Sequence, residues 1–210
     1  PQYSNRSRFW ELESGSDCGT FGIRGYRPIS VSMISASSVN TLPTSGNPAN
    51  SALAETAYRK TETRIQLSVR TKLAQGILTG GHPTLKDSLW FGYTQQSYWQ
   101  LFSGGISRPF RSTDHEPEVI YAYPTDLALP SGWRMRYTGL GVVHQSNGQA
   151  LPLSRSWNRV YLMTGIEKDH VARVQARIWK RLPEGSSDDN PGISDYIGRA
   201  EVSNYWDVDK

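Results

Sequence analysis

Residues 64–73 carry the clearest alternation of apolar and polar side chains in the chain. The odd positions from Ile65 to Leu73 are apolar apart from one threonine, and the even positions from Arg64 to Lys72 are polar or charged. Because successive side chains of a β-strand point to opposite faces, this pattern predicts a strand with one apolar and one strongly polar face. The further strands predicted by similar patterns span residues 20–34, 88–102, 118–129, 133–144, 156–167, 171–182 and 196–206.

Turn-forming sequences separate these strands, and short connections alternate with longer ones. That arrangement is typical of a β-barrel with short turns at one end and long loops at the other. The region 35–60 is rich in Ser, Asn, Pro and Ala and predicts one long loop. Residues 1–19 are polar and predict a flexible N-terminal arm, so the domain organisation expected is this arm followed by one all-β domain over residues 20–210.

Composition narrows the class of protein without fixing it. The hydrophobic content is 37% and the mean hydropathy −0.55, and no stretch approaches the run of about 20 apolar residues that a spanning helix needs. A transmembrane barrel remains open, because only alternate residues of its strands face lipid. The 7 Trp and 11 Tyr suit the interfacial girdles of such a barrel, and they would equally suit a carbohydrate-binding β-sandwich.

Cysteine content and charge exclude two further classes. The single cysteine, Cys18, allows no internal disulfide framework. The net charge is +4, but the basic residues are spread through the predicted strands and no Lys/Arg run stands out. Nucleic-acid binding is therefore not expected.

A histidine, a serine and an asparagine lie within one predicted hairpin. His144 and Ser146 are two positions apart on one strand and so point to the same face. If the next strand pairs antiparallel about a centre near Leu151, Asn158 lies opposite His144, within about 5 Å. The spacing thus predicts a Ser-His-Asn triad.

The chemistry of hydrolysis requires these residue types. A serine hydroxyl becomes a strong nucleophile when an imidazole removes its proton, and the imidazole needs a third group to fix its tautomer. A neutral asparagine stabilises the imidazolium less than an aspartate would, so a metal ion is a natural additional electrophile. Because Asn158 shares its face with Val160 and Leu162, the triad is expected on an apolar outer surface, which indicates a lipid substrate.

Several motifs in consistent order over about residues 60–206 resemble the bacterial outer-membrane phospholipase A family. The first two are His144-Gln145-Ser146-Asn147-Gly148 and Ser154-Arg155-Ser156-Trp157-Asn158-Arg159. The others are Tyr93-Thr94-Gln95-Gln96-Ser97-Tyr98-Trp99-Gln100, Pro109-Phe110-Arg111 with Glu116-Pro117, and Asp188-Asp189-Asn190-Pro191.

The resemblance implies a twelve-stranded antiparallel transmembrane β-barrel in the Gram-negative outer membrane. It also implies calcium-dependent hydrolysis of phospholipid acyl esters, of A1, A2 and lysophospholipase type, activated by homodimerisation. By position, Ser146 is the nucleophile, His144 the base and Asn158 the orienting residue. The calcium ligands implied are Ser107, the carbonyl of Gln149, Ser154 and Asp189. Gln95 matches a polar residue near the dimer contact.

The chain departs from the family pattern in sequence and in length. Gln149 stands where Arg is usual, which a backbone ligand tolerates, and Gln145 replaces the commoner Asp beside the site. About eight strands are predicted, and an open sheet would leave unpaired edges in lipid, so we expect the barrel to be incomplete at the C-terminus and the chain to be a fragment.

Two other functions stay open at the level of sequence. A non-enzymatic barrel, acting as a pore or structural protein, would carry the same strand pattern with idle triad residues. A soluble β-sandwich lectin would use the aromatic residues instead. The Asp188-Asp189-Asn190-Pro191 segment would also make a good turn without any metal.

Overall fold

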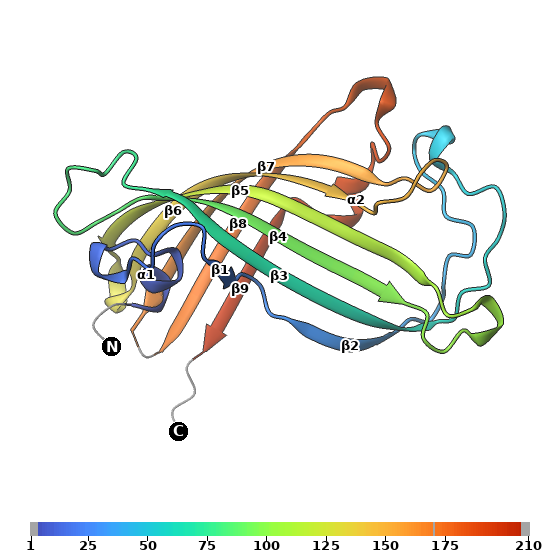
Figure 1. The fold of residues 1–210 in the computed structure, drawn as a ribbon, viewed down its shortest axis with the longest axis horizontal. Helices are drawn as coiled ribbons and strands as arrows, with labels where there is room; N and C mark the ends of the chain where they lie inside the picture. Colours follow the sequence, from blue (N-terminus) through green and yellow to red (C-terminus); the bar gives the residue numbers. More distant parts are fainter. Residues whose placement is uncertain (1–3, 170, 207–210) are drawn as a thin grey trace.

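The computed structural model describes residues 4–169 and 171–206. The strands are β1 Ile23–Gly25, β2 Ser30–Ser35, β3 Thr61–Gln75, β4 Ser88–Trp99, β5 Phe110–Ala128, β6 Arg134–Ser146, β7 Ser156–Lys168, β8 Ala172–Leu182 and β9 Ala200–Trp206 (Figure 1). The helices are α1 Asn5–Trp10 and α2 Ile193–Ile197, and the short 3-10 turns are η1 Ser14–Ser16, η2 Pro48–Asn50, η3 Gly104–Ile106, η4 Pro130–Gly132 and η5 Gly185–Ser187. Within the described part of the chain, neither α-helix has the length and apolar character needed to cross a membrane.

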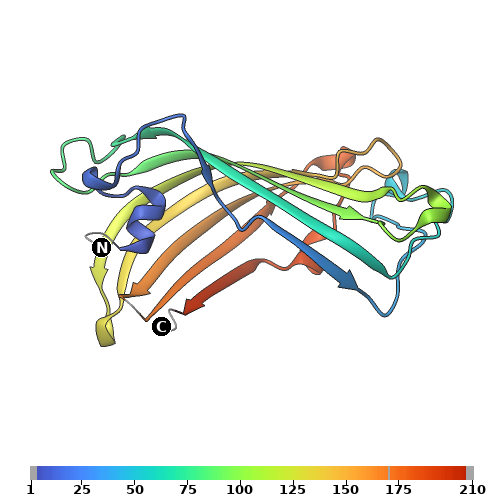
Figure 2. The same ribbon diagram turned by 60° about the horizontal axis from the view of Figure 1, so that its bottom comes forward.

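All the strands belong to one antiparallel sheet in which neighbours in sequence are neighbours in space. From β3 to β9 each strand pairs with the next, and β1 and β2 both pair with the free side of β3. The sheet curls into a deep trough, seen most clearly in Figure 2. The predicted all-β antiparallel barrel architecture is therefore confirmed.

The largest differences between the predicted and the observed strand boundaries are at the starts of β5 and β9. β5 begins at Phe110 rather than at residue 118, because residues 110–117 continue to pair with β4. The interruption that Pro28 predicts within residues 20–34 is confirmed: Pro28, which has no amide hydrogen to donate, lies between β1 and β2. The strand predicted from residue 196 begins only at Ala200, after α2.

Apolar side chains cover the outer face of the sheet and polar side chains its inner face, the reverse of the arrangement in a water-soluble protein. The exposed outer side chains of the strands include Leu67, Val69, Phe91, Val119, Leu140, Val142, Leu162, Ile178 and Val202. The buried inner ones include Gln66, Ser68, Arg70, Lys72, Thr94, Glu116, Glu118, Glu167 and Arg177. This is the arrangement of a barrel whose outer surface faces lipid.

Several buried charges of the interior are paired with one another. Glu118 accepts a hydrogen bond from the hydroxyl of Tyr161 at 2.6 Å, and Arg27 contacts the same carboxylate at 3.4 Å. Arg177 donates to the hydroxyl of Tyr26 at 2.6 Å. Because burying an unpaired charge is costly, these contacts stabilise the polar interior.

The flexible arm predicted for residues 1–19 is described from residue 4 onward, and residues 1–3 lie outside the described residues. Figure 2 shows α1 inside the curve of the sheet, where it contacts β6 and β7. The Trp10 side chain is fully buried and meets the rings of Trp90 and Tyr137 edge-on, with centroids 6.0 and 5.9 Å apart. Burial of this indole against the interior stabilises a segment whose sequence is otherwise polar.

Two glycines of the β6–β7 pair accommodate tyrosine rings from the partner strand. Gly141 pairs with Tyr161 and Gly165 with Tyr137. A Cβ atom would lie 2.3 Å from the Tyr161 ring at the first position and 2.2 Å from the Tyr137 ring at the second. The absent side chains thus allow both rings to lie flat on the sheet and fix the register of the hairpin.

Candidate active site

The β6–β7 hairpin brings His144 and Asn158 together as its spacing predicts. The two residues are direct cross-strand partners. The Nδ1 atom of His144 and the Oδ1 atom of Asn158 lie 2.8 Å apart, a hydrogen-bonding distance. With Oδ1 as acceptor, Nδ1 carries the hydrogen, and Nε2 is left with its lone pair. The histidine is exposed on the outer face, in line with the expected position of the site.

Ser146 lies two residues after His144 on the same face of β6. Its hydroxyl accepts a hydrogen bond from the amide of Gly148 at 3.2 Å. Within the described part of the chain no hydrogen bond joins this hydroxyl to His144. The structure therefore places the two residues predicted as nucleophile and base on one face of β6 without a hydrogen bond between them, a contact that in serine hydrolases often forms only with substrate bound.

Glu184 is a component of this cluster that the sequence reasoning missed. The Nδ2 atom of Asn158 donates to Glu184 Oε1 at 2.5 Å. This contact fixes the orientation of the amide, so that its oxygen faces His144. A signal was available, because Asn158 pairs with Leu182 on β8, and Glu184 follows two residues later.

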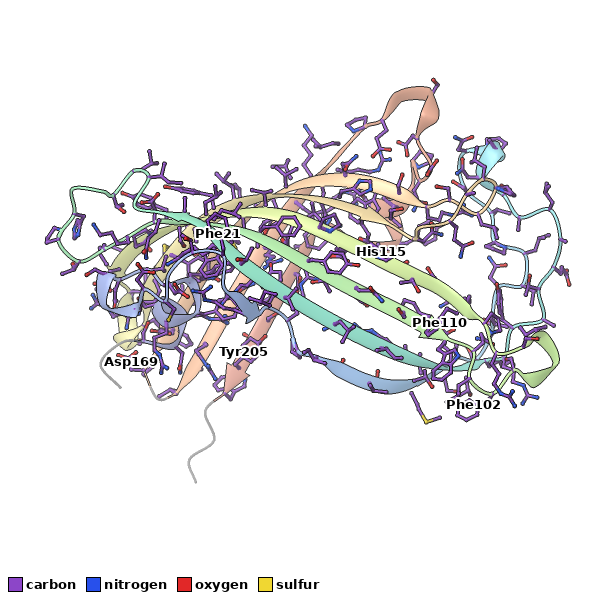
Figure 3. All side chains as sticks on the ribbon, viewed as in Figure 1. Phe21, Phe102, Phe110, His115, Asp169 and Tyr205 are labelled. Atoms are coloured by element: carbon purple, nitrogen blue, oxygen red, sulfur yellow. The ribbon has the colours of Figure 1, made fainter. Side chains whose placement is uncertain are left out.

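His115 is a second neighbour that the sequence did not single out. It lies on β5 (Figure 3) and is the cross-strand partner of Ser146. Its Nδ1 atom is 2.6 Å from the hydroxyl of Tyr93, which is also 3.2 Å from Gln95 Oε1. Gln95, which the resemblance places near the dimer contact, thus belongs to a polar group on the outer face beside the site.

Two of the four expected calcium ligands lie together at the loop end of the hairpin. Ser154 Oγ donates to Asp189 Oδ2 at 2.5 Å, and Ser156 Oγ reaches the same oxygen at 3.0 Å. The side chain of Gln149 instead donates to the carbonyl of Arg111 at 3.2 Å. Ser107 follows η3 in another loop, and no hydrogen bond among the described residues joins it to the other three.

Asn50 joins this cluster from the long loop between β2 and β3. Its side chain is 1% exposed, and its Nδ2 atom donates to Asp189 Oδ1 and to the carbonyl of Ser154, both at 3.0 Å. Figure 1 shows this loop, in cyan, beside the loop that follows β8. Nothing in the local sequence pattern connects these segments, so the contact could not be predicted.

The surroundings of Asp189 favour the ionised form of its carboxyl group. Burial raises the pKa of its carboxyl group, but hydrogen bonds from Ser154, Ser156 and Asn50 outweigh that effect and hold the pKa below its usual 3.8. The neighbouring Asp188 forms an ion pair with Arg181. No cluster of three His, Cys, Asp or Glu side chains suited to a metal occurs in residues 4–169 and 171–206. The oxygen-rich set of hydroxyls and one carboxylate nevertheless fits a hard cation such as calcium, because hydroxyl hydrogens can rotate away.

The comparisons with known proteins agree on one family. The family model described as phospholipase A1 matches residues 6–210. A relative from Neisseria meningitidis is 37% identical over 207 residues, which cover 95% of this chain and 52% of that protein. Phospholipase A1 of Escherichia coli K12 is 41% identical over 140 residues, or 67% of this chain and 45% of that protein. The chain thus spans about half the length of the curated relatives it matches.

Solved structures show the same similarity at the level of the fold. Outer membrane phospholipase A from Escherichia coli superposes with a TM-score of 0.73 and 30% identity, covering 90% of this chain and 72% of the other. The Salmonella typhi outer membrane phospholipase dimer with bound calcium gives a TM-score of 0.62 and 37% identity, covering 71% and 55%. The resemblance carried by the sequence motifs is confirmed, and the chain belongs to the phospholipase A1 family.

Proposed function

We propose that this chain is an outer-membrane serine hydrolase that cleaves acyl ester bonds of phospholipids, including A1, A2 and lysophospholipase reactions. The observation that carries the proposal is the His144–Asn158 hydrogen bond on the apolar outer face, with Ser146 on the same face of β6. A structure similar to this chain, with a TM-score of 0.62 and 35% identity, is the Escherichia coli enzyme with an asparagine-to-alanine active-site substitution. An asparagine in the active site of that relative supports the role of Asn158.

The reaction follows from the hydrogen bonds of the hairpin. Asn158 holds the Nδ1 hydrogen of His144, so that Nε2 can accept the hydroxyl proton of Ser146 as its oxygen attacks the ester carbonyl. The amide of Gly148, which now faces the hydroxyl, is a donor for the developing oxyanion. His144 returns the proton to the departing glycerol oxygen. A water molecule, deprotonated by His144 in turn, then releases the fatty acid from Ser146.

In this proposal, the lipids of the outer membrane surround the apolar outer face and also provide the phospholipid substrate. The outward side chains next to the site on β6 and β7 include Val142 and Leu162, which are 50% and 58% exposed. An apolar surface of this kind is stable against lipid chains rather than water. Phospholipids in the same leaflet therefore reach Ser146 without crossing a polar loop region.

Calcium is the cofactor that the loop cluster fits. The proposed ligands are Ser154, Asp189, the carbonyl of Gln149, and Ser107, and a bound calcium ion would supply positive charge near the oxyanion. Asn50 holds the Asp189 carboxylate in place for this role. Because Ser107 stands on another loop, after η3, and forms no hydrogen bond with the other proposed ligands among the described residues, we infer that a second copy provides it. Activation by homodimerisation follows, in keeping with the calcium-bound Salmonella typhi dimer.

The test is fatty-acid release from phospholipid in detergent micelles, with calcium and with excess EDTA. Ser146→Ala is expected to abolish release, while Ser32→Ala on β2, the matched control, retains it. EDTA is expected to abolish release by the unsubstituted protein. Release that survives Ser146→Ala would contradict the triad, and release insensitive to EDTA would contradict the calcium ligands. A folded dimer without any release would instead favour a non-enzymatic barrel.

A further inference from the structure

A cavity of about 430 Å³ lies at the loop end of the sheet. Its walls come from the end of β2, the loop over residues 36–60, the start of β5 and the loop over residues 147–155. The cationic side chains in its lining are Arg59, Lys60, Arg111 and Arg155. Arg59 and Lys60 are exposed and therefore solvated, and the four cations together give this hollow a positive field that favours an anionic ligand.

The acidic partner in the lining neutralises one of these cations. Glu62 receives two hydrogen bonds from Arg111, at 2.9 Å from Nε and 2.6 Å from the terminal nitrogen. Among the described residues, no carboxylate forms an ion pair with Arg59, Lys60 or Arg155. The cavity therefore has a surplus of positive charge.

Arg155 is held in a position to bind a ligand. One terminal nitrogen donates to the carbonyls of Ser154 at 2.7 Å and Pro152 at 3.4 Å, which fixes the guanidinium against its own loop. No other hydrogen bond of that side chain occurs in the described part of the chain, so its remaining donors are available.

An apolar hollow adjoins the basic cavity. Arg59 and Lys60 line both, and Val39, Tyr58 and Phe102 supply apolar surface to the second. Phe102 is 44% exposed and stands at the same end of the sheet as Phe110 (Figure 3). A ligand that fills both spaces needs an anionic head and an apolar chain.

We propose that the basic cavity binds the phosphate group of a phosphorylated lipid, whose chain lies in the hollow of Val39, Tyr58 and Phe102. Arginine and lysine side chains form strong charge-assisted hydrogen bonds with phosphate oxygens. Asn147 and Gln149, which follow Ser146 closely in sequence, also line the cavity, so a bound lipid touches the loop after the proposed nucleophile. The inference goes beyond the proposed function, because binding does not require hydrolysis.

The experiment measures binding by isothermal titration to the Ser146→Ala protein in micelles, in EDTA, so that no probe is consumed. The probes are short-chain phosphatidic acid, the matching diacylglycerol, and inorganic phosphate. Phosphatidic acid is expected to bind at least about tenfold more tightly than either other probe. Adding Arg155→Gln or Lys60→Gln is expected to weaken its binding by about tenfold, the effect of one charge-assisted hydrogen bond.

Arg8→Gln is the matched control, because it removes the same charge from an exposed position on α1. Equal weakening in this control would mean that binding follows net charge, and would overturn the cavity as the site. Diacylglycerol binding as tightly as phosphatidic acid would overturn recognition of the phosphate. Inorganic phosphate binding equally well would overturn the lipid as ligand. Unchanged affinity in Arg155→Gln and Lys60→Gln would overturn the role of these cations.

Discussion

The carboxylate of Glu184, which contacts Asn158, is predicted to stabilise the positive charge that His144 acquires during catalysis. His144 Nδ1 lies 2.8 Å from Asn158 Oδ1, and Asn158 Nδ2 lies 2.5 Å from Glu184 Oε1. With an amide group between them, the carboxylate oxygen lies within about 7.5 Å of the imidazole. Glu184→Gln keeps an acceptor for Asn158 and removes only the negative charge.

The size of the effect follows from Coulomb's law. At about 7.5 Å, the attraction between a carboxylate and the imidazolium formed during attack is about 0.6 kcal/mol in water and about 2 kcal/mol near a protein surface. These energies correspond to about a 3-fold to about a 30-fold decrease in kcat. Both Asn158 and Glu184 are partly exposed, so a loss of about tenfold or less is expected.

The assay is steady-state hydrolysis of phospholipid micelles with saturating calcium. Glu184→Gln is expected to lower kcat with little change in KM, because the carboxylate acts through Asn158 and not on the substrate. Glu184→Ala is expected to lower kcat further, since the asparagine amide then loses its fixed orientation. Glu55→Gln, in the exposed part of the loop between β2 and β3, is the control. An unchanged kcat in Glu184→Gln, or a change confined to KM, would refute the reasoning.

Three further predictions concern the buried carboxylate of Asp87, the contact of Gly165 with Tyr137, and the proposed calcium ligand Asp189. Hydrogen bonds from Thr79, Tyr121 and Leu78 overcome burial and lower the pKa of Asp87 from 3.8 to about 2, so its contribution to stability is present above pH 3.8 and lost as the pH falls through about 2. Asp87→Asn is expected to cost about 2 kcal/mol in denaturant unfolding at pH 7, and a cost that persists undiminished near pH 2 would contradict this. Gly165→Ala should lower the free energy of unfolding by about 1–3 kcal/mol, because its methyl group would clash with the Tyr137 ring. The control Gly81→Ala, where a Cβ would meet nothing within 4 Å, should unfold like the unsubstituted protein. Equal denaturation midpoints for the two variants would contradict the close contact between Gly165 and Tyr137. Asp189→Asn should raise the calcium concentration for half-maximal hydrolysis at least about tenfold, measured by titration, and an unshifted midpoint would remove Asp189 from the ligand set.

The sequence by itself determined the features that depend on local repetition. Alternating side chains mark the strands because a strand places neighbours on opposite faces. The pairing of His144 with Asn158 was predictable for the same reason, since a hairpin fixes its register around its own turn. The apolar face that carries both residues follows from that register.

Contacts between distant segments were decided by the tertiary structure alone. The α1 segment reads as polar, and its place in the interior depends on the cluster of Trp10 with Trp90 and Tyr137 that the curved sheet creates. Asn50 and Asp189 are 139 residues apart and meet because the sheet carries their loops to the same end. No periodicity encodes such a meeting, because side-chain alternation fixes only the face on which a residue lies. The curvature of the sheet determines which loops meet, and this curvature is a property of the whole sheet.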